Sequence, residues 1–227
     1  MSYFSRIILD ASNYQANLIL RNISQNGYSE HQALWKLFPD DPDASRDFLF
    51  RAEQKPLQRI FYMVSQRQPI AAPGWLVESK PYKPVITTGQ ALAFTLRANP
   101  VVTRKDENGK RQRHDVVMNE KHEIGFAKLS QQERPAMPEL IRNAGEKWLM
   151  SRAEKQGFEI AEQGFMVESY DQHRSSKRGN SKPISHSTMD LAGVLRVTDV
   201  EQFTDCLFNG IGPAKAFGCG LMLVRRF

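Results

Sequence analysis

Cysteine is scarce in this chain of 227 residues, which contains only Cys206 and Cys219. Two cysteines provide no disulfide framework, and their spacing does not match a metal cluster. The chain also lacks any run close to the ~20 consecutive apolar residues that an α-helix needs to cross a bilayer. The sequence therefore indicates neither a disulfide-stapled secreted domain nor a helical membrane protein, and we expect no membrane partner.

Histidines in metal-binding patterns are absent as well. His114, His122, His173 and His186 lie in polar stretches, and no histidine is spaced from another histidine, a cysteine or a carboxylate pair as a metal site requires. We therefore expect neither a metal nor another cofactor. The first residues lead directly into a strand-like segment, so we expect no signal peptide and a location in the cytoplasm.

Positive charge is what the chain has in surplus. The 31 Lys and Arg residues outnumber the 25 Asp and Glu residues, which gives a net charge of +6. The composition, 41% hydrophobic and 25% charged, is that of a globular protein with enough material for a core. The positive balance favours a polyanionic partner such as a nucleic acid.

The N-terminal half predicts several strands and one clear helix. Residues 3–9 suit a strand, and a polar stretch follows up to Gly27. Ser29 and Gln32 match a capping box with Ser29 as N-cap, so we predict a helix from there to Pro39. Two short strand candidates and one poorly defined element complete this half, at residues 48–50, 59–64 and 69–76.

A proline- and glycine-containing linker at residues 81–89 places a domain boundary near residue 88. The later elements run strand, helix, strand, strand, helix, strand, which is the ferredoxin-like or split β-α-β order. We assign them to residues 91–97, 130–155, 158–170, 185–197, 199–208 and 221–225. We therefore predict an α+β protein with two tandem ferredoxin-like (RRM-like, βαββαβ) domains, at residues 1–88 and 89–227.

Four glycines flank a single lysine, Lys215, in the segment Gly210–Gly220. Glycine permits positive φ and a close approach of the backbone, and a lysine among glycines suits an anion such as a phosphate. Nucleotide-binding glycine loops follow a strand and precede a helix, whereas this one follows a predicted helix and precedes a predicted strand. A close approach to a ligand and a purely structural turn therefore both stay open.

Two basic segments, residues 103–114 and 172–182, are predicted to be exposed. The second is at the tip of a predicted hairpin, where a basic loop can enter a groove. Its four cations can each neutralise a phosphate: Arg174, Lys177, Arg178 and Lys182. The alternative is that both segments are solvated loops whose charge serves solubility.

His31 is the strongest candidate for catalysis. With Ser29 as N-cap, His31 would lie in the first helical turn, where the helix dipole favours a neutral imidazole and an adjacent phosphate. Such an imidazole can act as general base for a ribose 2′-hydroxyl. Tyr28 is a candidate for proton transfer, and Lys36 for offsetting negative charge. The alternative is that His31 simply occupies the start of a helix.

Four motifs that occur in order resemble the CasE family, the CRISPR repeat-processing endoribonucleases of type I-E systems. They are His31–Pro39, Ser45–Arg51, Phe94–Pro100 and Gly210–Leu221, and the resemblance runs from the first predicted strand to the last. It implies two ferredoxin-like domains and metal-independent cleavage of precursor CRISPR RNA at the base of the repeat stem-loop. In this reaction a 2′-hydroxyl attacks the scissile phosphate.

The resemblance also assigns roles to residues. His31 falls on the family's catalytic histidine, and Tyr28 matches a tyrosine that some members place three residues earlier. The basic hairpin would enter the groove of the repeat stem, and the product would stay bound within the Cascade complex with other Cas subunits. The predicted RNA-binding cations are Lys36, Arg46, Arg97, Arg104, Arg174, Lys177, Arg178, Lys182 and Lys215.

Two other functions stay open at this point. A non-catalytic RNA-binding subunit on the same fold would bind repeat RNA without cleaving it. A metal-dependent nuclease would need ligands that the sequence pattern does not provide. Binding without new RNA fragments would indicate the first, and sensitivity to EDTA the second.

Overall fold

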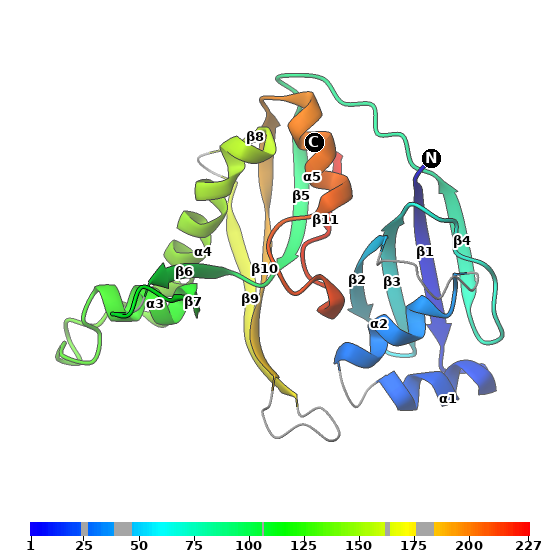
Figure 1. Cartoon of the computed structure of the whole chain (residues 1–227), viewed down its shortest axis with the longest axis horizontal. Coiled ribbons are helices and arrows are strands. Elements are labelled where there is room, and N and C mark those ends of the chain that lie inside the picture. Colours follow the sequence, from blue (N-terminus) through cyan, green and yellow to red (C-terminus); the bar gives the residue numbers. More distant parts are fainter. Residues whose placement is uncertain (24–26, 39–46, 106, 162–163, 176–183) are drawn as a thin grey trace. The chain divides into compact units, whose positions relative to one another are not determined.

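Two antiparallel sheets form separate units in the computed structural model, which describes residues 1–23, 27–38, 47–105, 107–161, 164–175 and 184–227 (Figure 1). The first unit contains Met1–Val85 and Leu207–Leu221, and the second contains Ile86–Cys206 and Met222–Phe227. The predicted mixed α and β class is confirmed. The division differs from residues 1–88 and 89–227 because the glycine-rich segment groups with the N-terminal residues.

The sheet of the first unit has the order β2-β3-β1-β4, with every neighbouring pair antiparallel. Alternation places Ile7 and Leu9 on one face, beside Phe50 and Phe61, and all four side chains are fully buried. This face is the core of the unit. The strands are β1 (Tyr3–Asp10), β2 (Phe48–Gln54), β3 (Gln58–Ser65) and β4 (Leu76–Pro81).

Helices α1 (Tyr14–Ile23) and α2 (Gly27–Trp35) belong to the first unit (Figure 1) and supply apolar side chains to this core. We predicted no helix at α1. Its start is marked by Asn13, whose Oδ1 accepts hydrogen bonds from the backbone N–H groups of Gln15 and Ala16 at 3.0 and 3.1 Å. An N-cap followed by apolar residues at helical spacing was therefore present within the stretch that we interpreted as polar.

The predicted capping box at Ser29 is wrong. Helix α2 begins at Gly27, and the Ser29 hydroxyl donates a hydrogen bond to the carbonyl oxygen of Ile23 at 3.0 Å. This hydroxyl therefore serves the end of α1 instead of the start of α2. His31 becomes the fifth residue of α2, beyond the four N–H groups that a helix start leaves unpaired.

The sheet of the second unit has the order β11-β5-β10-β8, and β9 also pairs with β10. All of these pairs are antiparallel. The predicted strands and their order are confirmed, with one predicted strand divided into β8 and β9. The strands are β5 (Ala91–Ala98), β8 (Phe158–Ile160), β9 (Met166–Ser175), β10 (Ile184–Val197) and β11 (Met222–Arg226).

Helices cover this sheet through close contacts. A Cβ on Gly145 of α4 would lie 2.6 Å from the sulfur of Met189, so the glycine lets the helix approach β10. The rings of Phe158 and Phe203 meet edge to face at 5.8 Å, which joins β8 to α5. The helical elements of this part of the chain are α3 (Val116–Glu123), α4 (Met137–Ala153), η1 (Glu154–Gln156) and α5 (Val200–Asn209).

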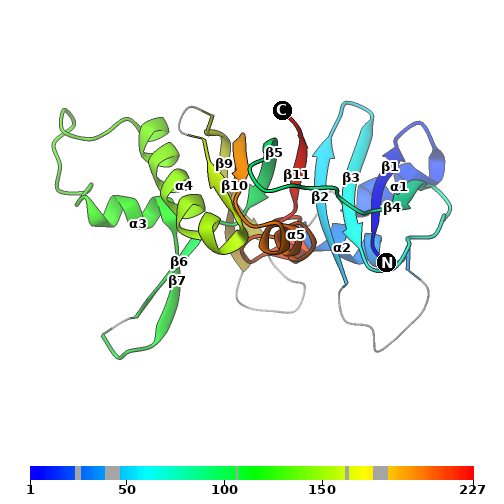
Figure 2. The same ribbon diagram turned by 90° about the horizontal axis from the view of Figure 1, so that it is seen from above.

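Two ribbons extend from the second sheet. Strands β6 (Val101–Lys105) and β7 (Arg111–Asp115) form a hairpin in the segment that we predicted to be basic and exposed, and Figure 2 shows it projecting away from β5 and β10. Strands β9 and β10 continue past β5 as a long curved ribbon (Figure 1). The basic tip predicted for this hairpin lies largely outside the described residues, since 176–183 are not among them.

Candidate functional site

The imidazole of His31 is packed among aromatic rings of the first unit. It is nearly parallel to the ring of Phe48, with 25° between planes and 5.3 Å between centroids, and its centroid lies 5.7 Å from that of Trp35. Phe48 is 4% exposed, whereas His31 is half-buried. Strand β2 thus supports the imidazole while part of the residue stays accessible.

The glycine-rich segment Gly210–Gly220 closely approaches the same strand, which is an edge of the sheet. A Cβ on Gly210, whose φ is +71°, would lie 2.8 Å from Leu49 Cδ1, and one on Gly218 would lie 3.2 Å from the ring of Phe50. Successive side chains of a strand point to opposite faces, so the segment contacts both faces of β2. The close approach that these glycines permit is made here to the protein's own strand.

Lys215 lies in η2 (Lys215–Phe217), a short helix within this segment that contacts both α2 and β2. It also lines a hollow of about 210 Å³ together with Phe48, whose ring stacks on the imidazole of His31. Phe48 therefore stacks on the histidine of α2 and lines the same hollow as the lysine of the C-terminal segment. The lining residues are Ser2, Asp47, Phe48, Leu49, Val64, Ser65, Gln66, Phe208, Asn209 and Lys215.

A second cation, Arg67, lies over Phe38, an aromatic ring that packs against Phe48. The Arg67 guanidinium lies 5.0 Å from the ring centroid of Phe38, and Phe38 stacks on Phe48 at 5.2 Å with 21° between planes. Asp47 holds this guanidinium through two hydrogen bonds, at 2.7 Å from Nε and 3.0 Å from Nη2. We did not single out these residues from the sequence. The alternation Phe48-Leu49-Phe50 was the available signal that two aromatic rings share one face.

Tyr28 and Lys36 belong to the same part of the chain as His31. Tyr28 is three residues before His31 in α2, a spacing that places two side chains on one side of a helix, but its side chain lies outside the described part. Lys36 is exposed and lines a hollow of about 620 Å³ with residues of α1 and with Trp75. The described contacts group His31 with Phe48 and Trp35, and Lys36 with this other hollow.

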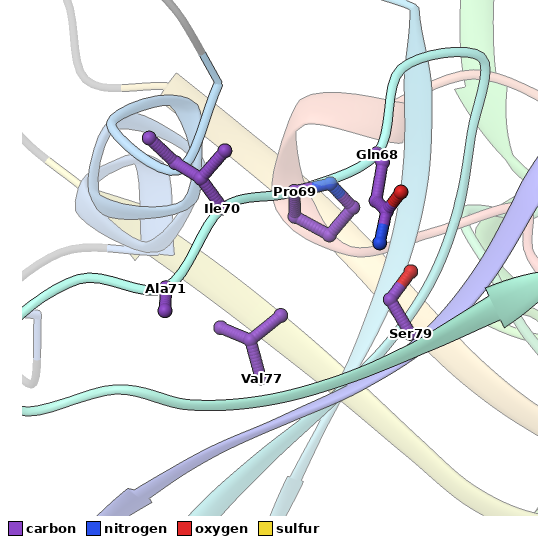
Figure 3. A pocket seen from close by; sticks show the side chains of 6 residues that line it. All are labelled: Gln68, Pro69, Ile70, Ala71, Val77 and Ser79. Atoms are coloured by element: carbon purple, nitrogen blue, oxygen red, sulfur yellow. The ribbon is translucent and has the colours of Figure 1, made fainter.

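A further hollow, of about 380 Å³, lies between β4 and the segment before it (Figure 3). Gln68 and Ser79 are at one end of it, and Val77 and Ala71 at the other. None of its six lining residues has an ionisable side chain, so the site with acid–base chemistry is not here. The remaining lining residues are Pro69 and Ile70.

The β9–β10 ribbon carries a pair of histidines close to residues 176–183. His173 and His186 are directly opposite each other in the register, with centroids 5.0 Å apart and 27° between planes. His173 Nε2 lies 2.7 Å from the Thr188 hydroxyl. Burial, and then the charge of His173, lower the pKa of His186. The side chain of Arg174 and all of Lys177, Arg178 and Lys182 lie outside the described part, as does Arg46.

Arg97 and Arg104 are both paired with carboxylates of the second unit. Arg97 donates two hydrogen bonds to Asp190, from Nε at 2.8 Å and from Nη2 at 2.7 Å. Arg104 donates from Nη2 to Glu123 at 2.6 Å, and its Nη1 lies 3.4 Å from His122. Arg97 thus joins β5 to β10, because Arg97 and Asp190 are register partners.

Asp115 organises a polar network that the sequence pattern did not reveal. Its carboxylate caps α3 and accepts hydrogen bonds from the hydroxyls of Tyr170, at 2.8 Å, and Ser187. Burial is the main cause that raises the pKa of Tyr170 to about 12; Asp115 adds to it, and a hydrogen bond from Gln172 opposes it. This network fixes the β9–β10 ribbon to the start of α3.

Other kinds of site are limited by what the described residues contain. Within the described ranges, no three His, Cys, Asp or Glu side chains are grouped so that they could hold a metal ion. In those same ranges no helix has both the length and the apolar character to cross a membrane. Both cysteines are buried thiols.

Comparison with known proteins gives consistent matches along the chain. A family model described as "CRISPR associated protein" matches residues 2–226. The Cascade subunit CasE of Escherichia coli is 32% identical over 90% of this chain and 94% of its own length. The CRISPR-associated endoribonuclease Cse3 of Thermus thermophilus is 28% identical over 88% and 90%. A structure of T. thermophilus Cse3, bound to an RNA representing a pre-cleavage complex, has a TM-score of 0.71 with 21% identity, covering 99% of this chain and 98% of that one.

Proposed function

Because the chain belongs to the CRISPR-associated proteins, and among them to the type I-E CasE family, we propose that it is the endoribonuclease that cleaves precursor CRISPR RNA at the base of the repeat stem-loop. The relatives named endoribonuclease and Cascade subunit support this activity. One observation carries the proposal for this chain. Phe48 stacks on the imidazole of His31 and also lines the hollow that Lys215 lines, and η2, which carries Lys215, contacts α2, which carries His31.

In the proposed reaction His31 is the general base. Its imidazole takes the proton of the ribose 2′-hydroxyl, and the 2′-oxygen forms a bond to the scissile phosphorus. The bond from phosphorus to the 5′-oxygen breaks, which leaves a 2′,3′-cyclic phosphate and a 5′-hydroxyl. Tyr28 or water returns a proton to the leaving oxygen. Lys215 offsets the charge that develops on the phosphate oxygens, and the mechanism needs no metal.

We propose two ferredoxin-like domains as the framework. The sheet orders β4-β1-β3-β2 and β11-β5-β10-β8 support this, since each places the first and third strands of its unit in the centre. The N-terminal domain would consist of residues 1–88, and Leu207–Leu221 would pack against it. The C-terminal domain would consist of the rest of 89–227.

The C-terminal domain would hold the RNA. We propose that Arg174, Lys177, Arg178 and Lys182 contact phosphates of the repeat stem, with Lys36 and Arg46 contacting RNA from the first unit. The β9–β10 ribbon, which extends beyond β5, supports this role (Figure 1). Arg97 and Arg104 would contact RNA while remaining paired with Asp190 and Glu123. The product would stay bound in a Cascade complex with other Cas subunits, in the cytoplasm where the RNA is transcribed.

The test is single-turnover cleavage of a repeat hairpin by excess protein. His31→Ala should lower the cleavage rate by about 10²- to 10⁴-fold, the range for loss of a general base, with hairpin affinity nearly unchanged. His114→Ala, which removes an exposed imidazole from β7, should cleave at the wild-type rate. Excess EDTA should have no effect.

Three results would contradict the proposal. Full activity of His31→Ala would remove this residue from the mechanism, and inhibition by EDTA would indicate a metal-dependent nuclease. Tight binding of the hairpin by the wild type without any new fragment would favour a non-catalytic RNA-binding subunit.

A further inference from the structure

The aromatic group beside His31 continues as an unbroken series of stacked side chains. His31 stacks on Phe48 at 5.3 Å, Phe48 on Phe38 at 5.2 Å, and the Arg67 guanidinium lies 5.0 Å from the Phe38 centroid. The Asp47 carboxylate ends the series by accepting two hydrogen bonds from Arg67. We call this series, from His31 to Asp47, the aromatic column. Its two phenyl rings are buried, at 4% and 5% exposure.

We propose that Phe48 is a positioning residue for the His31 imidazole and that Arg67, held by Asp47, fixes the far end of the aromatic column. This inference rests on the proposed function of His31 as general base. It assigns to Phe48 the orientation of the ring and leaves the proton transfer itself to His31.

The physical reason is the freedom of a histidine side chain. Rotation about the imidazole's own χ2 bond has broad minima, so the backbone of α2 alone does not fix the direction of its nitrogens. A flat ring at stacking distance removes most of this rotation, because turning the imidazole would drive its edge into the phenyl face. Trp35, at 5.7 Å and 45° to the imidazole, limits motion on another side.

Phe48 can perform this role only if it is itself immobile. Its ring also contacts Trp35 at 5.6 Å, and its neighbour in the sequence, Asp47, anchors Arg67. The same Arg67 lies over Phe38 and 6.0 Å from the centroid of Trp35, so one guanidinium touches two members of the surrounding group. The carboxylate of Asp47 balances its charge, and the ring faces attract the imidazolium that forms during the reaction.

The test compares Phe48→Leu with Phe61→Leu. Phe61 is a matched control because it is a fully buried phenylalanine of the same core, in contact with Phe50 and Trp75. Phe48→Leu should lower the single-turnover cleavage rate by about 10- to 100-fold, since a misplaced catalytic group costs about this much, with hairpin affinity within about twofold. Phe61→Leu should cleave within about threefold of the wild type. Arg67→Gln should show a smaller loss, of about three- to tenfold.

A second measurement needs no RNA. In the proton NMR spectrum, the His31 ring resonances should move downfield in Phe48→Leu, because the ring current of the stacked phenyl group is lost, and should stay in place in Phe61→Leu. Equal cleavage rates for the two leucine variants, or unmoved His31 resonances, would overturn the inference. If Phe48→Leu does not fold, Arg67→Gln decides, and a wild-type rate in that variant would overturn it. Failure of the proposed function shows separately, as a wild type that does not cleave or a His31→Ala variant that does.

Discussion

The surroundings of His31 and the β9–β10 ribbon hold their side chains by different kinds of contact. Around His31 the contacts are ring on ring, and glycines let η2 approach β2. Along the β9–β10 ribbon the contacts are polar: Arg97 with Asp190, Tyr170 with Asp115, and His173 with Thr188. Close packing therefore holds the side chains of the first region, whereas hydrogen bonds and an ion pair hold those of the second. Substitutions should therefore affect the rate of cleavage in the first and the affinity for RNA in the second.

The largest effect that would sharpen this contrast is expected at Gly210. A Cβ there would lie 2.8 Å from both the Gly220 carbonyl oxygen and Leu49 Cδ1, so Gly210→Ala must displace backbone. We expect it to lower the free energy of unfolding by about 2–4 kcal/mol, from the left-handed conformation and from overpacking. Urea unfolding measures this.

Gly109→Ala is the matched control for that experiment. Gly109 has nearly the same φ, +75°, but no atom of the described residues lies within 4 Å of the place that its Cβ would take. The free energy of unfolding of Gly109→Ala should fall by only about 1–2 kcal/mol, the cost of the left-handed conformation. Equal losses in the two variants would mean that the close approach to β2 contributes nothing.

An intermediate effect is expected at the hairpin tip. The double variant Lys177→Gln, Arg178→Gln should weaken hairpin binding about tenfold and reduce the salt dependence of log Kd by about 1.5, because each phosphate contact contributes about 0.7–0.9. The cleavage rate at saturating protein should not change. The control Lys128→Gln, Arg142→Gln removes the same charge from exposed positions elsewhere in the second unit. The same slope change in both would show that net charge, and not the tip, governs binding.

The smallest effect concerns the histidine pair. The pKa of His186 lies below its usual 6.5, so the unfolded chain binds more protons between these two pKa values. Stability contributed by neutral His186 should therefore be complete above pH 6.5 and be lost as the pH falls toward the lowered pKa. NMR titration should give a midpoint below 6.5, and His173→Gln should raise it because one repelling charge is removed. A midpoint unchanged by that substitution would show that burial alone acts.

Local patterns in the sequence were sufficient for much of the fold. Apart from β4, where we predicted no strand, the strands of both sheets and the order of helix, glycine segment and strand near the C-terminus follow from apolar alternation and from glycine chemistry. The helix starts were harder. The hydroxyl of Ser29 has two possible backbone partners, and only the packing of α2 against α1 decides that it bonds to Ile23.

The candidate site was predictable only in part. His31 and Lys215 stood out by residue type, but Phe48, which stacks on His31 and lines the same hollow as Lys215, is an ordinary apolar residue of a strand. The pairing of Arg97 with Asp190 likewise depends on the register between β5 and β10, which no local pattern specifies. Contacts between distant segments depend on how helices and strands pack, and the spacing of residues in a single sequence does not predict them.

The return of Leu207–Leu221 to the first unit has a consequence for protein synthesis. A ribosome releases Met1–Val85 long before it reaches this segment, and domains generally begin to fold from the N-terminus during translation. The edge of β2 at Leu49 and Phe50 therefore emerges without the glycines that later cover it. Lys215 can reach its place only after residues 86–206, which lie between the two parts of the first unit, have been synthesised. A chain that stops before residue 207 would contain His31 but not the segment that brings Lys215 to α2 and β2.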